Sequence, residues 1–117
     1  MDPVERKLRA HSHLQLGNIA SQLQQLAEAE REFRRATEVA PGLELASLAL
    51  FHVLNDQARA VEALDEMRRF VEHRDSEMYR ELVEEGALRE VRDRQLVSLE
   101  RVDEIEALLA KWAAPRT

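Results

Sequence analysis

The chain has 117 residues, a net charge of −6 and no cysteine. This length suits one domain with one core, and the lack of cysteine excludes disulfides and thiolate zinc sites. An acidic chain repels phosphate backbones and anionic lipids, so we expect neither nucleic-acid nor membrane binding. No apolar run is long enough to span a bilayer, and the polar N-terminus is unlike a secretory signal, so we expect a cytoplasmic protein.

The first half of the chain predicts two helices. Asp2-Pro3 is a good helix start, because Asp caps free N–H groups and Pro is tolerated at the first position. We expect that helix to continue to about residue 22. Gly17 lies inside it at a cost of about 1 kcal/mol relative to Ala, which predicts close approach of a neighbouring helix. A second helix is expected over 25–39, before the stop at Ala40-Pro41-Gly42.

Further helices are predicted in the rest of the chain, about six in all. The segment 43–54 is apolar nearly all round and should be buried. A fourth helix is expected over 58–73, and Asp75-Ser76 should cap a fifth. Residues 88–100 give no clear pattern, and an amphipathic helix is expected around 102–112.

A repeat of 34 residues is visible in the pattern of small and large residues. Ala29 and Ala63 are 34 residues apart, and the same offset pairs Phe33 with Met67. Tetratricopeptide repeats have this period and consist of two antiparallel helices. Residues 10–43 resemble that family's signature, with expected residues at six of its eight positions: Leu16, Gly17, Ala29, Phe33, Ala36 and Pro41. His13 and Ala20 replace the usual Trp and Tyr.

This resemblance implies one all-α domain over 1–117, a short stack of antiparallel helix-turn-helix repeats. Repeat 1 spans about 10–43. Repeat 2, about 44–77, keeps Leu50 and Ala63 but departs further from the signature. The repeat signature is not found a third time at the same offset, so residues 78–113 are expected to be capping helices.

The resemblance also implies a protein-binding module, such as an adaptor or a chaperone-like protein, that holds a peptide or helix in a concave groove. The groove positions that it implies are His11, Leu14, Asn18, Ser21, Leu45, Leu48, His52, Asn55 and Tyr79. Two alternatives stay open. The C-terminal helices can cover this face and make its Leu residues core, or the chain can assemble with itself, as a homodimer that buries Leu45, Leu48 and Trp112.

Patterns that carry catalysis are missing from the sequence. His11 and His13 are two residues apart and face different sides of a helix, whereas a metal pair needs a spacing of three or four. There is no phosphate loop, dinucleotide turn or serine elbow. We therefore expect no enzyme, no metal and no cofactor. The pairs Arg34-Arg35 and Arg68-Arg69 are expected to be salt-bridged surface.

Overall fold

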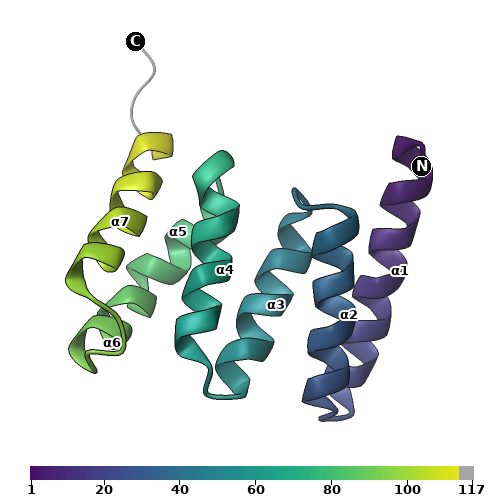
Figure 1. Cartoon of the computed structure of the whole chain (residues 1–117), viewed down its shortest axis with the longest axis horizontal. Helices are drawn as coiled ribbons and strands as arrows, with labels where there is room; N and C mark the ends of the chain where they lie inside the picture. Colours follow the sequence, from purple (N-terminus) through teal and green to yellow (C-terminus); the bar gives the residue numbers. More distant parts are fainter. Residues whose placement is uncertain (114–117) are drawn as a thin grey trace.

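The computed structural model describes residues 1–113, which form α-helices and no strand (Figure 1). The all-helical expectation is confirmed, and one short helix, α6, lies in the segment where the sequence pattern was unclear. The helices are α1 (Pro3–Gln22), α2 (Leu26–Val39), α3 (Glu44–Asp56), α4 (Ala60–His73), α5 (Glu77–Glu84), α6 (Ala87–Asp93) and α7 (Leu99–Ala113). No helix among these residues combines the length and apolar character needed to cross a bilayer.

Both predicted helix caps are present. The Asp2 carboxylate accepts a hydrogen bond from the backbone N–H of Glu5 at 2.9 Å, with Pro3 in the first turn. The Ser76 hydroxyl accepts one from the N–H of Tyr79 at 3.1 Å and begins α5. Gly86 then separates α5 from α6 with a φ of 110°, a left-handed conformation that glycine adopts without strain.

The first four helices stand side by side and alternate in direction (Figure 1). The bounds of α4, residues 60 and 73, each follow those of α2, residues 26 and 39, by 34 positions. The ends of α1 and α3 show the same offset. Gln24 and Ala58 both have left-handed φ values, 59° and 60°, and each next residue donates an N–H back to a carbonyl of the last helical turn at 2.9 Å.

Helices α1 and α2 pack closely because small residues lie where they meet. A Cβ atom at Gly17 would overlap the ring of Phe33, which confirms the predicted packing reason for this glycine. Ala29 and Ala36 on α2 are fully buried, and Phe33 is almost fully buried. Ala29, Phe33 and Ala36 of α2 therefore lie at its contact with α1.

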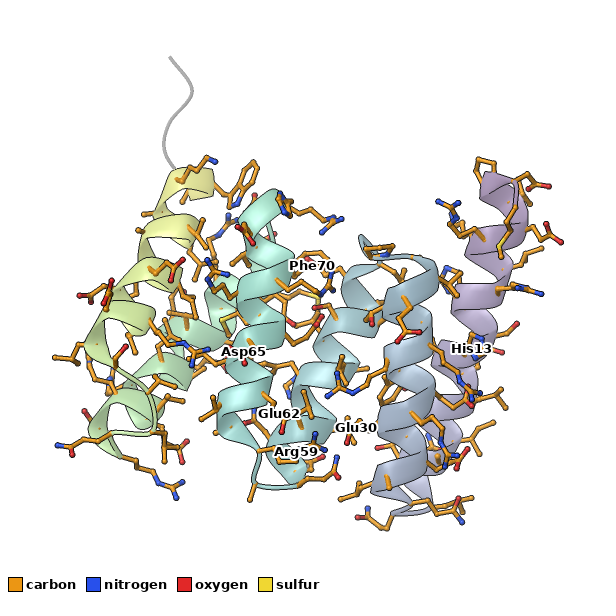
Figure 2. All side chains as sticks on the ribbon, in the orientation of Figure 1. His13, Glu30, Arg59, Glu62, Asp65 and Phe70 are labelled. Carbon is orange, nitrogen blue, oxygen red and sulfur yellow. The ribbon has the colours of Figure 1, made fainter. Side chains whose placement is uncertain are left out.

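Helix α7 packs against α4, at the opposite end of the row from α1 (Figure 1). Arg68 donates to Glu104 at 3.0 Å, and Arg101 pairs with Asp65, which Figure 2 labels on α4. The indole N–H of Trp112 donates to the carbonyl of Val71 at 2.6 Å. The C-terminal helices thus cover α4 and leave α1 uncovered.

Candidate binding cleft

A cleft of about 610 Å³ opens between the α3–α4 turn and helices α5 and α6. We call it the α3–α6 cleft. This volume is typical of a ligand site. Most of its lining is apolar: Phe51, Ala58, Ala60, Val61, Leu64, Leu82, Ala87, Val91 and Leu96. Its polar lining residues are His52, Asn55, Arg59, Glu62, Glu90 and Arg94.

Local chain geometry forms the two walls. On one side, the left-handed conformation at Ala58 turns the chain from α3 directly into α4, which brings the end of one helix beside the start of the other. On the other side, Gly86 lets α6 leave α5 at an angle, so that Leu82 and Val91 face the same space. Leu82 is half-buried and Val91 is buried, which makes this wall continuous with the core.

The charged residues at the cleft are already paired. Arg59 donates to the carboxylates of Glu62 and Glu30, and Figure 2 shows these three side chains converging where the α3–α4 turn meets α2. Arg94 lies 3.6 Å from Glu90 on the opposite wall. The charges of these two arginines and two glutamates cancel, so the cleft does not present unpaired cations to an anionic ligand.

Glu30 anchors this network from α2. Its carboxylate accepts hydrogen bonds from Gln57 at 2.9 Å, from Arg34 at 2.9 Å and from Arg59. Burial raises the pKa of Glu30, but these three hydrogen bonds outweigh it and hold the pKa below its usual range. The hydrogen bond from Arg59 likewise lowers the pKa of Glu62. Both carboxylates therefore stay charged and bound at neutral pH.

The expected salt-bridged surface is confirmed for both arginine pairs. Arg34 pairs with Glu30 and Glu62, and Arg35 pairs with Glu32 at 3.3 Å. In the second arginine pair, Arg68 forms ion pairs with Glu72 and Glu104, and Arg69 forms one with Glu66. Within residues 1–113, no three His, Asp or Glu side chains gather closely enough to hold a metal ion.

The structure divides the predicted groove residues into four groups. Only His52 and Asn55 line the α3–α6 cleft, and both are exposed. Asn18 and Leu45 are exposed elsewhere, on α1 and α3. His11 and Ser21 are half-buried on α1. The remaining three are buried: Leu14, Leu48 and Tyr79.

The prediction that Leu14, Leu48 and Tyr79 face a partner is therefore wrong, because they are core residues. Tyr79 shows this most clearly, since its ring packs edge-on to that of Phe51 with centroids 5.6 Å apart. Its hydroxyl hydrogen-bonds the Ser47 hydroxyl at 2.7 Å, and Ser47 in turn donates to Glu66 at 2.6 Å. Tyr79 thus fastens α5 to α3 and α4.

Two residues of the second wall, Val91 and Leu96, were missed by sequence reasoning. They lie in the segment whose sequence pattern was unclear. Their place depends on the turn at Gly86, which a helical period does not encode. The only sequence feature that pointed to this wall was the spacing of apolar residues along 87–97.

Comparisons with known proteins add no relative. A scan against protein-family models found no match, and searches of curated proteins and of solved structures each returned no similar chain.

Proposed function

We propose that this chain is a non-enzymatic protein-interaction module whose α3–α6 cleft binds a short apolar peptide or helix of another protein. The observation that carries the proposal is the composition of the cleft. Its apolar lining includes the exposed Leu96 and the half-buried Val61 and Leu82, while its charged residues are already in ion pairs. A ligand would gain mainly from burying apolar side chains, with His52 and Asn55 available for hydrogen bonds at the same wall.

We further propose that the scaffold is tetratricopeptide-like, with α1–α2 and α3–α4 as two repeats and α5–α7 as the cap. The offset of 34 residues between the bounds of α2 and α4 supports this. So does the identical backbone ending of α1 and α3 at Gln24 and Ala58. In such a scaffold the exposed residues of the first helix of each pair face a ligand, and we assign this role to His52.

A selection from a library of random peptides tests the proposal. We expect peptides with two or more large apolar residues to be recovered, and their amide-shift perturbations in the protein to centre on Val61, Leu82 and Leu96. Leu96→Arg should weaken their binding at least ~10-fold, because it places a charge in an apolar wall.

Leu99→Arg is the matched control. Leu99 is also exposed, only three residues along the chain, but it does not line the cleft. The Leu99→Arg variant should bind the selected peptides with the affinity of the natural chain. Equal binding by both variants, with melting temperatures unchanged, would show that the peptides bind elsewhere and would refute the assignment of the cleft.

A further inference from the structure

Helix α1 has two apolar faces on opposite sides. One face packs against α2 through Ala10, Leu14, Gly17 and Ala20. The other face is exposed, and α1 itself stands at the end of the row of helices (Figure 1). Steps of three, four or eight residues place the side chains of the exposed face in one stripe. We call this stripe the α1 outer face, and its members are 53–69% exposed: Val4, Leu8, Leu16, Ile19 and Leu23.

The opposite end of the row looks different. Helix α7 buries Val102, Ile105 and Leu109 and exposes the side that carries Asp103 and Glu106. Stacked helices need such a polar outer face at each end to remain separate in water. Only the α7 end has one. An exposed apolar stripe over the whole length of a terminal helix therefore marks an interaction surface.

Four of the five residues of the α1 outer face are matched with one another about the centre of the helix. A two-fold axis between residues 13 and 14 would place Val4 opposite Leu23 and Leu8 opposite Ile19 of an antiparallel copy. The same operation places Ser12 opposite Gln15, the two polar residues in the middle of the stripe, where the Gln amide can donate to the Ser hydroxyl. A symmetric interface between identical chains requires this matching of a surface with itself.

Charge favours the same arrangement. The first half of α1 carries three cations and one carboxylate, Arg6, Lys7, Arg9 and Glu5, whereas residues 10–27 contain no Asp, Glu, Lys or Arg. Parallel pairing would oppose these cations to their own copies. Antiparallel pairing places them beside the uncharged half of the partner helix and near its C-terminus, where the helix dipole is negative and the last turn has no basic residue.

We propose that two copies of this chain associate through the α1 outer face as an antiparallel, two-fold symmetric dimer. Each of the five side chains exposes on the order of 100 Å² to solvent. Two chains would therefore bury roughly 1,000 Å² in total, which is near the lower limit for a specific interface. This dimer uses neither Leu48, which is buried, nor the Trp112 indole N–H, which is bonded to Val71. It also leaves the α3–α6 cleft open.

Light scattering after size-exclusion chromatography tests the association. From about 1 µM to about 500 µM, we expect the mass to rise toward twice the 13.5 kDa of one chain. Leu8→Glu should raise the dissociation constant by at least ~100-fold, because symmetry introduces the charge twice. Ile19→Glu should act equally. Leu99→Glu, an equally exposed leucine at the other end, should leave the dimer intact.

Two cysteine variants test the orientation in a chain that has no other thiol. Glu5→Cys and Gln22→Cys, mixed in equal amounts and oxidised, should form the mixed disulfide in preference to either self-linked product. A chain that stays monomeric throughout, or a dimer that survives both Leu8→Glu and Ile19→Glu, overturns the proposal. Self-linked Glu5→Cys dimers overturn the antiparallel arrangement. Circular dichroism of each variant verifies that it is folded, and peptide binding in the cleft is an independent readout.

Discussion

Gly17 lies against the aromatic ring of Phe33, and that contact sets the distance between α1 and α2. Glycine inside an exposed helix normally lowers stability relative to alanine by up to about 1 kcal/mol. Here the added methyl group would overlap a ring that is itself held in the core. The steric term opposes the helix-propensity term and exceeds it, since a buried ring cannot move away as a surface side chain can.

We therefore expect Gly17→Ala to lower the free energy of unfolding by roughly 1–3 kcal/mol, measured by urea denaturation. Gly42→Ala is the control, because its new Cβ would meet only the flexible Arg74 side chain, and it should change stability by less than ~0.5 kcal/mol. Combining Gly17→Ala with Phe33→Leu should relieve part of the overlap, so the two losses should not add. Strict additivity would contradict this explanation.

Helix α5 is attached to α3 and α4 through a buried polar chain of Tyr79, Ser47 and Glu66. Arg69 completes it by donating to Glu66 at 2.7 Å and 2.8 Å. Burial raises the pKa of Tyr79 well above its usual range, and the hydrogen bond with Ser47 only partly offsets this. The folded chain therefore keeps the phenol proton at a pH at which an unfolded chain loses it.

This difference predicts alkaline sensitivity. Because the folded pKa lies above the unfolded value near 10, the contribution of Tyr79 is complete below pH ~10 and is lost as the pH rises, by about 1.4 kcal/mol per unit. Tyr79 is the only tyrosine, so absorbance at ~295 nm should show no phenolate until the protein unfolds. Tyr79→Phe should remove this slope while lowering stability at neutral pH. Titration of native Tyr79 near its usual pKa would contradict the burial argument.

Sequence reasoning located helices better than it located surfaces. Helices α1–α4 were predicted closely because local signals mark their ends, such as Asp2-Pro3 and Pro41-Gly42. Leu14 was predicted to line the groove and Leu16 to occupy a position of the repeat signature, yet Leu14 is core and Leu16 is more than half exposed. Periodicity does not say which of two apolar faces meets a neighbour, because that depends on how α2 packs. Two residues of the second wall of the cleft were missed for the same reason.

At the scale of the whole molecule, α7 is held differently from the other helices. It contributes Val102, Ile105 and Leu109 to the core, but its polar links to α4 are exposed pairs such as Arg101 with Asp65, which contribute little in water. Trp112, the only tryptophan, lies within this contact and reports on it.

We therefore expect α7 to detach before the remaining helices unfold. In a urea titration, Trp112 fluorescence should change at a lower urea concentration than helical circular dichroism. Coincident transitions by the two probes would instead show that the molecule unfolds as one unit.

The side-by-side order of α1 to α4 also has a consequence for the speed of folding. Each of these helices packs mainly against the next one along the chain, so little entropy is lost in closing loops before contacts form. Chains dominated by such local contacts fold in microseconds to milliseconds. Docking of α7 onto α4 is the exception, because it joins residues such as Val71 and Trp112 across 41 positions. We accordingly expect the docking of α7 onto α4 to be the last step in the folding of this protein.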